Sequence, residues 1–403
     1  MKWKKVILGL MGAAIFAAGS GQATAAVYKY EPVTGAEISF DKYLVMDQEA
    51  NVPNQTFQFT IEPGAGVAAE DSRLRVQGGD ADSVSGQPTI ARDQAKFQVG
   101  DPTFTTPQDL AANGTQAATQ KKDPVQLEKG QKYAKKAVKV DFSKVAFSEP
   151  GVFRWKITEE AVQAPGIIND QELMRYLDVY VVDKEGKLVV QGYVLHKDAA
   201  FTPVSQGTAE EPAAGKSIGF INQYETHDLT LSKTVTGNQG SRDQYFKFTV
   251  ALNSGTKGTV FDVDLSKADA VTGTNPYSPE AHKNPASLTT NAEGKVEATF
   301  WLQHGQTIRI LGLPQGTSYT ITEDAEEYRP QVKLTEGKEA RTIKKAVAED
   351  TSMEADTTAA YTNDKTGIIP TGLQTHLSLY LGIMGAGLIG LVWFFLRRVH
   401  ARK

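Results

Sequence analysis

The sequence contains no cysteine in 403 residues, and its six histidines are scattered singly along the chain. Disulfide bonds, thiolate zinc sites and cysteine nucleophiles are therefore excluded, and a histidine-rich metal centre is not expected. Charge is nearly balanced, with 43 basic and 47 acidic residues. A hydrophobic share of 40% excludes a mainly disordered chain, and the length predicts two or three domains.

Both ends of the chain have the composition of targeting segments. Residues 1–26 begin with lysines and continue with a short apolar run and small residues, as in a secretory signal peptide. The uncharged run 377–396 is 20 residues long, which is the length of a transmembrane helix, and a basic tail follows it. We therefore expect a chain that is exported and then held in the membrane by its C-terminal end.

The part between these ends is acidic. Without them, 36 basic and 47 acidic residues remain, a net charge of −11. Such a surface is a poor partner for nucleic acid and suits an exposed extracellular protein. The sequence has no phosphate-binding glycine loop, metalloprotease helix or serine nucleophile motif, so we expect no cofactor, no metal and no turnover enzyme.

The middle of the chain predicts β-strands. Between residues 27 and 363, apolar and polar residues alternate, as at Phe57, Phe59 and Ile61. Pro-Gly, Gly-Gly and Gly-Asn turns separate these short runs, a pattern typical of antiparallel sandwiches. Residues 65–120 are expected to form long inserted loops, and residues 206–216 a second polar loop.

The two halves of this region share one order of motifs. Each half has a lysine in its first strand, a glutamate in an Ile-Thr-Glu segment after a Pro/Gly turn, and an asparagine in its last strand. In chain order these residues are Lys42, Glu159 and Asn222, then Lys233, Glu323 and Asn363. The repeat predicts an all-β protein with two similar domains, 27–222 and 223–366.

Strand parity places these polar groups among apolar ones, because residues two apart share a face. Each one taken alone is better explained as a strand end or an ordinary ion pair. The same trio in both halves favours a special role. Desolvation should lower the pKa of the lysine and raise that of the glutamate. A neutral amine could then attack the asparagine amide, with the glutamate moving protons and ammonia leaving, once per site.

This arrangement resembles the intramolecular isopeptide domains of Gram-positive pilins, and above all the two-domain streptococcal major (backbone) pilins. The similarity extends over most of the mature chain and is weakest across 65–145 and 197–215. It implies two tandem immunoglobulin-like sandwiches of the CnaB type. It also implies two bonds with a catalytic glutamate each: Lys42 to Asn222 with Glu159, and Lys233 to Asn363 with Glu323.

The C-terminal region, 367–403, resembles a sortase sorting signal. Its motif is Ile368-Ile369-Pro370-Thr371-Gly372, ahead of the apolar run and basic tail. The usual form is Leu-Pro-x-Thr-Gly, so this variant favours a dedicated pilin sortase over a housekeeping one. The resemblance implies that a sortase cleaves the chain after Thr371 and joins Thr371 to a lysine of the next subunit. Lys216 is the preferred lysine, Lys197 is the second choice, and a solvated loop lysine is the alternative for Lys216.

Three classes of function follow. The first is the backbone subunit of a wall-anchored, extracellular pilus, whose partners are a pilin-class sortase, copies of itself, accessory pilins and peptidoglycan. The second is a singly anchored cell-wall adhesin or minor pilin, with the long loops of the first domain binding a host receptor. The third, a surface enzyme, has no motif in its favour. The resemblance favours the first.

Overall fold

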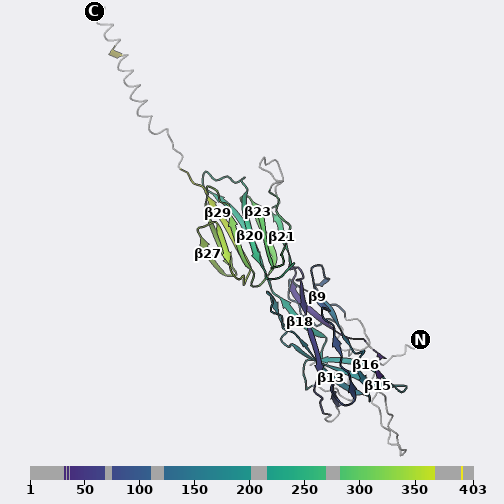
Figure 1. The fold of residues 1–403 in the computed structure, drawn as a ribbon. Helices are drawn as coiled ribbons and strands as arrows, with labels where there is room; N and C mark the ends of the chain where they lie inside the picture. The colour runs from purple at the N-terminus through teal and green to yellow at the C-terminus, as the bar shows by residue number, and fades with distance from the viewer. Residues whose placement is uncertain are drawn as a thin grey trace, which may run out of the picture.

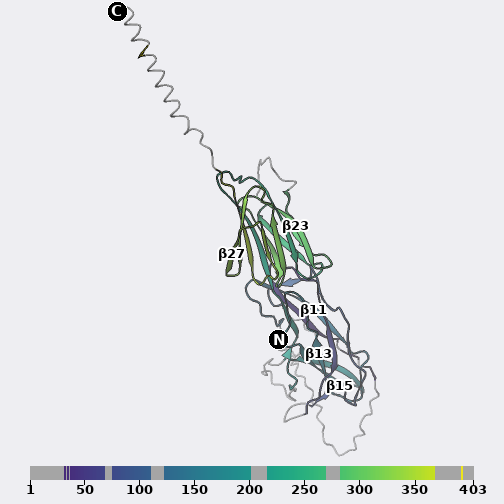
Figure 2. The same ribbon diagram turned by 60° about the vertical axis from the view of Figure 1, so that its left-hand side comes forward.

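The computed structural model describes residues 31–32, 34–35, 37–68, 75–109, 122–200, 216–268, 282–367 and 392–393. Figures 1 and 2 show two β-rich bodies stacked end to end. The predicted all-β fold with tandem domains is confirmed. Within the described residues, no helix is both long and apolar enough to cross a bilayer. The predicted signal peptide, the sorting motif and all but two residues of the run 377–396 lie outside them.

The first body is built mainly from two sheets. One has the order β10-β11-β3-β18-β14, with β8 beside β11. Its strands are β3 (Ile38–Asp47), β8 (Thr89–Ile90), β10 (Thr103–Phe104), β11 (Gln131–Asp141), β14 (Ile167–Ile168) and β18 (Gly219–Tyr224). The other has the order β17-β16-β15-β13-β5, with β2 and β6 at its margins. Its strands are β2 (Thr34–Gly35), β5 (Phe59–Pro63), β6 (Val76–Gly78), β13 (Gly151–Glu159), β15 (Met174–Lys184), β16 (Lys187–His196) and β17 (Lys216–Ser217).

Two small sheets complete the first body. They contain β1 (Glu31–Pro32), β7 (Val84–Ser85) and β12 (Ala146–Phe147), and the pair β4 (Gln55–Phe57) and β9 (Ala95–Phe97). One apolar core joins the two main sheets, because Phe40 and Leu44 of β3 share a buried cluster with Phe153 and Trp155 of β13. This is the packing of a β-sandwich.

The second body repeats the plan with a larger and a smaller sheet. The larger has the order β22-β21-β24-β19-β29-β26-β27 and the smaller β23-β20-β25-β28. The strands of the larger sheet are β19 (Thr226–Thr236), β21 (Val260–Lys267), β22 (Ser287–Thr289), β24 (Thr307–Pro314), β26 (Arg329–Glu336), β27 (Glu339–Ile343) and β29 (Thr357–Asp364). Those of the smaller are β20 (Phe246–Asn253), β23 (Lys295–Leu302), β25 (Ser318–Glu323) and β28 (Val347–Asp350). A second core cluster lies between them.

The inserted stretch 65–120 is not all loop, so this expectation was incomplete. Its described part includes β6 to β10, and Ala95 and Phe97 of β9 belong to the main core. Residues just beyond it cover the outer face of β3, where Val125 packs with Tyr43 and Tyr133. Two-residue and three-residue strands carry too little periodicity to be recognised from sequence.

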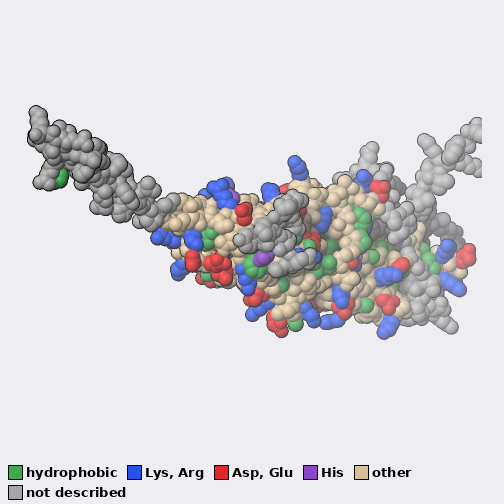
Figure 3. All heavy atoms as spheres, turned by 90° about the horizontal axis from the view of Figure 1, so that it is seen from above, with side chains coloured by type: hydrophobic (Ala, Val, Ile, Leu, Met, Phe, Trp, Pro, Cys, Tyr) green, Lys and Arg blue, Asp and Glu red, His purple; other side chains and the backbone are tan. Residues whose placement is uncertain are grey.

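The two bodies meet in a tight junction. A single residue, Glu225, separates β18 from β19. The Asn54 side-chain amide donates to the Gly258 carbonyl at 2.7 Å, and Arg309 lies 2.9 Å from the Glu49 carboxylate. These contacts link the bodies directly, and we propose that the chain divides into domains 27–222 and 223–366. The face in Figure 3 carries basic and acidic side chains interspersed, as expected of a solvated surface.

Candidate functional sites

The first candidate site lies between the two sheets of the first body. Lys42 of β3 and Asn222 of β18 come from adjacent parallel strands, and Glu159 ends β13 on the facing sheet. The Lys42 Nζ lies 2.8 Å from Glu159 Oε1 and 3.0 Å from Oε2. Asn222 Nδ2 donates to Glu159 Oε1 at 2.9 Å. The glutamate therefore contacts both the amine and the amide.

The second candidate site has the same construction. Lys233 of β19 and Asn363 of β29 lie on adjacent parallel strands, and Glu323 ends β25 on the other sheet. The Lys233 Nζ donates to Glu323 Oε1. Asn363 Nδ2 donates to the same oxygen at 2.9 Å. In both halves the predicted trio is thus brought together around one carboxyl group.

Strand register explains why the two trios match. Phe220 pairs with Lys42 across β18 and β3, and the asparagine follows two residues later on the same face. Tyr361 pairs with Lys233 in the same way, again two residues before the asparagine. Because side-chain direction has a period of two, one register places lysine and asparagine side by side in both bodies.

All six side chains are removed from solvent. Their residues are between 0% and 3% exposed. Aromatic rings line both sites: the Lys42 Nζ lies 4.5 Å from the centre of the Phe57 ring, and the Lys233 Nζ lies 4.1 Å from that of Phe246. Phe59 and Phe248 pair with the two glutamates across the strands. An apolar wall of this kind excludes water from the ionisable groups.

Burial shifts the ionisable groups towards their neutral forms. It lowers the pKa of Lys42 and of Lys233 to about 8, although the glutamate beside each opposes the change. Burial also raises the pKa of Glu159 and of Glu323, against the nearby lysine. At neutral pH about a tenth of each amine is unprotonated, so a nucleophile is present in both sites.

The two candidates for the lysine that receives Thr371, Lys216 and Lys197, lie near the edge of the first body. Lys216 is half-buried in β17, where it pairs with His196, so its predicted position in a loop was wrong. A two-residue edge strand leaves no alternation for a sequence analysis to detect. Lys197 is exposed and follows the end of β16. The motif 368–372 lies outside the described residues, which end on this side at Gly367.

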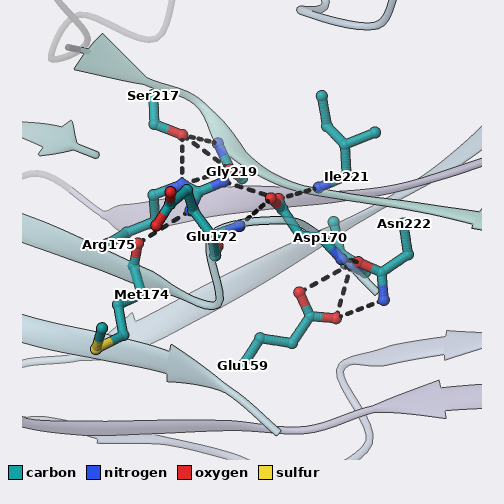
Figure 4. A network of polar contacts seen from close by, with 10 residues as sticks. Glu159, Asp170, Glu172, Met174, Arg175, Ser217, Gly219, Ile221 and Asn222 are labelled. Atoms are coloured by element: carbon teal, nitrogen blue, oxygen red, sulfur yellow. Dashed lines mark hydrogen bonds and ion pairs between the residues drawn. The ribbon is translucent and has the colours of Figure 1, made fainter. Parts of the chain in front are cut away.

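Two residues beside the first trio were missed by the sequence analysis. The backbone N–H of Asp170 donates to Asn222 Oδ1 at 2.9 Å, and Arg175 lies 2.7 Å from the Asp170 carboxylate (Figure 4). Arg175 is buried in β15 at alternate positions with Leu177 and Val179, so the alternation along this strand is a sequence signal for its inward position. Asp170 acts through its backbone, and no residue pattern reveals that.

Comparison with known proteins gives two family matches. Residues 96–225 match a Spy0128-like isopeptide containing domain, and residues 227–365 match a domain of unknown function. The chain is 25% identical over 377 residues to a pilin of Streptococcus pyogenes serotype M1, covering 92% of each chain. It is 36% identical over 151 residues to a pilus tip adhesin of S. pyogenes, covering 37% of this chain and 18% of the adhesin. The crystal structure of the S. pyogenes major pilin aligns with 83% of this chain and all of its own, at 23% identity and a TM-score of 0.46.

Proposed function

We propose that the chain, which is similar to a Streptococcus pyogenes pilin over 92% of both chains, is the backbone subunit of a cell-surface pilus. The observation that carries the proposal is the pair of buried Lys–Glu–Asn trios with one shared register. The pilin match extends along both chains, whereas the adhesin match covers a small part of the adhesin. A structural subunit is therefore favoured over a singly anchored adhesin, a minor pilin or a surface enzyme.

The chemistry proposed for each trio is formation of an amide between two side chains. The unprotonated lysine Nζ attacks the asparagine Cγ, so the Nζ–Cγ bond forms and the Cγ–Nδ2 bond breaks. The glutamate accepts a proton from Nζ and delivers a proton to Nδ2, and ammonia leaves. Holding the groups in contact lowers such a barrier by ~7–11 kcal/mol. Each site reacts once, so the glutamates Glu159 and Glu323 are catalysts without turnover.

The contacts within the second trio favour the protonated form of Glu323. Glu323 Oε2 and Asn363 Oδ1 are both buried and have no hydrogen-bond partner among the described residues. A buried acceptor without a donor costs about 1–3 kcal/mol. A proton on Glu323, favoured by its raised pKa, would turn one acceptor into a donor for the other. The same hydrogen bond would polarise the Asn363 carbonyl towards attack.

Polymerisation is the second part of the proposal. A pilin-class sortase cleaves Ile368-Ile369-Pro370-Thr371-Gly372 after Thr371 and joins this residue to Lys216 of the next subunit. Lys216 suits this role because it lies in β17, an edge strand of the first body, whereas Gly367, the residue before the motif, follows β29 of the second body. Accessory pilins, cell-wall peptidoglycan and host surface receptors complete the proposed set of partners, and the wall-anchored pilus is the proposed location.

Covalent ladders in cell-wall extracts test the function. We expect the wild-type chain, produced with its sortase, to give a ladder of high-mass species that resists boiling in detergent. Lys216→Ala should abolish the ladder, while Lys197→Ala, a change of an exposed lysine near the same edge, should preserve it. A single wall-linked species in wild type would contradict the backbone function. A ladder that persists in Lys216→Ala and disappears in Lys197→Ala would reassign the linking lysine.

A further inference from the structure

The two trios differ in what contacts the asparagine carbonyl. In the first site, Asn222 Oδ1 accepts the backbone N–H of Asp170 at 2.9 Å (Figure 4). In the second site, Asn363 Oδ1 has no partner among the described residues. Attack of an amine on either Cγ places negative charge on this oxygen. A hydrogen-bond donor aimed at it therefore stabilises the transition state in the first site only.

Strand length explains the difference. The edge strand β14 pairs with β18 for only two residues and ends at Ile168. The chain then leaves the sheet, so the Asp170 N–H is free of the ladder and turns towards Asn222. The corresponding strand β26 pairs with β29 along its whole length, with Pro330 opposite Asn363. At the position opposite Asn363, proline has no N–H to donate.

The Asp170 N–H is held in place through its own side chain. Its carboxylate Oδ2 accepts the Ile221 backbone N–H at 2.8 Å and the Arg175 guanidinium at 2.7 Å, and Oδ1 accepts the Glu172 N–H at 3.0 Å. The anchor at Ile221 is next to Asn222 in β18. The carboxylate therefore ties the loop to the strand that carries the reacting amide.

Arg175 holds the Asp170 carboxylate in this position. It is 1% exposed, and its remaining N–H groups donate to the Ser217 hydroxyl at 3.0 Å and to the carbonyls of Gly219, Met174 and Glu172. Its guanidinium lies 4.6 Å from the centre of the Phe220 ring. A guanidinium with this many partners has one available position. It fixes Asp170 against both β15 and β18.

We propose that Asp170, positioned by Arg175, supplies an oxyanion-stabilising N–H to the first site, and that the second site reacts without one. The inference rests on the proposed isopeptide chemistry. In the first site, the glutamate can start as a carboxylate, because the carbonyl is already polarised; it takes the proton from Nζ and passes it to Nδ2. In the second site, Glu323 has to be protonated to polarise Asn363: it gives its proton to Oδ1 as the Nζ–Cγ bond forms, then takes a proton from Nζ and passes it to Nδ2, and regains its own proton from Oδ1 as ammonia leaves. The Lys42–Asn222 bond should therefore form first.

The test follows ammonia loss at each site separately. Chains that are kept unfolded in urea, so that no bond has formed, are refolded by dilution. Samples are quenched in acid at successive times, and their intact mass is measured by mass spectrometry. A Lys233→Ala background reports the first site alone, and a Lys42→Ala background reports the second. One oxyanion-hole donor accounts for ~10²–10³ in rate. Asp170→Ala removes the carboxylate that positions the backbone N–H of residue 170 but keeps the N–H itself. We therefore expect the first site to slow by at least ~10-fold and the second site to keep its rate.

Two further variants and a pH series separate positioning from general damage. Gln171→Ala changes an exposed side chain in the same loop and should leave both rates unchanged. Asp170→Asn keeps an acceptor for Ile221 and should retain part of the rate. In Asp170→Ala the first site should also lose rate at alkaline pH, as the second does, because Glu159 must then be protonated. Loss of packing alone would not create that dependence.

Three outcomes would overturn the inference. The first is an Asp170→Ala chain whose first site reacts at the wild-type rate. The second is a chain with Asp170→Ala or Asp170→Asn in which both sites slow by the same factor. The third is a wild-type chain in which the second site reacts before the first. A wild-type chain that folds and loses no ammonia at either site would instead remove the isopeptide chemistry itself. The failure of the inference is therefore distinguishable from the failure of the function on which it rests.

Discussion

Burial acts in the same direction on both ionisable partners of each trio, because it favours the neutral amine and the neutral acid. The lysines retain a pKa near 8, low enough for some free amine at neutral pH. An ion pair of the same residues on the surface would keep both groups charged and unreactive. The aromatic residues around the sites, Phe57 and Phe246 among them, therefore contribute to the chemistry by excluding water.

The rate of bond formation at the first site, followed in the Lys233→Ala background, should rise between pH 6 and pH 8. Below a pKa of about 8 the lysine Nζ is mostly protonated, and a protonated amine has no lone pair for attack. If the amine alone limits the rate, the increase is ~50-fold over this range. Ammonia loss after refolding at several pH values measures it, with tryptophan fluorescence as a control for folding. A first-site rate that falls or stays constant from pH 6 to 8 would contradict this account of Lys42.

Much of each trio could be predicted at the residue scale, because parity and repetition are both present in the sequence. Lys42 alternates with Phe40 and Leu44, and the structure buries all three. The backbone donor at Asp170 could not be predicted, since it depends on where β14 ends. A side chain has a sequence signature; the direction of a peptide N–H in a loop has none.

At the scale of elements, the reacting strands are parallel neighbours inside otherwise antiparallel sheets. β18 lies beside β3, and β29 lies beside β19. Each pair sets the last strand of a body beside its first long strand, so a bond between them would close nearly the whole body into one loop. A crosslink over such a long interval constrains the unfolded chain strongly, by on the order of 5 kcal/mol in the chain-entropy model used for disulfides.

Pulling experiments should reveal this closure. If the proposed Lys233–Asn363 bond is present, force applied between residue 216 and the C-terminal end should pass along β18 and β19 to Lys233 and cross to Asn363, so that the 130-residue interval between them stays folded. Glu323→Ala should release that interval and add roughly 400 Å or more of extension at ~3.4 Å per residue. Glu349→Ala, an exposed glutamate in β28, is the matched control. Equal extension in wild type and Glu323→Ala would exclude the load path.

The long strands of both bodies follow their alternation, and the sequence predicted them for that reason. β20, for example, buries Phe246, Phe248 and Val250 and leaves the residues between them more exposed. The elements that escaped prediction are short: β9 within the insertion and β17 with Lys216. Their formation depends on pairing with distant partners, β4 and β16, and not on a local pattern.

At the scale of the whole molecule, the junction decides whether the two bodies move as one. Gly312 of β24 has a φ of 66°, and a Cβ there would lie 2.6 Å from the Ala50 Cα of the first body. Only glycine permits both the left-handed backbone and this approach. Together with the Asn54 and Arg309 contacts, it keeps the subunit extended, as Figures 1 and 2 show.

Gly312→Ala should loosen the junction. The added methyl group has to push Ala50 away, and left-handed backbone adds strain, so we expect a destabilisation of about 1–3 kcal/mol and a broader distribution of shapes in small-angle X-ray scattering. Gly305→Ala is the control, because Gly305 has a φ of 83° but nothing within 4 Å of a Cβ. It should show the backbone strain alone. Identical scattering and stability for the two variants would mean that the Ala50 contact does not hold the bodies together.

The most direct test of the whole account is the intact mass of the folded mature chain. Two internal amides release two ammonia molecules, so the wild-type chain should weigh ~34 Da less than its sequence, and Glu159→Ala and Glu323→Ala should each weigh ~17 Da less than theirs. Circular dichroism on the same samples confirms that the chains are folded. A folded wild-type chain with the full mass of its sequence would contradict the central claim that each sandwich fuses its own lysine and asparagine.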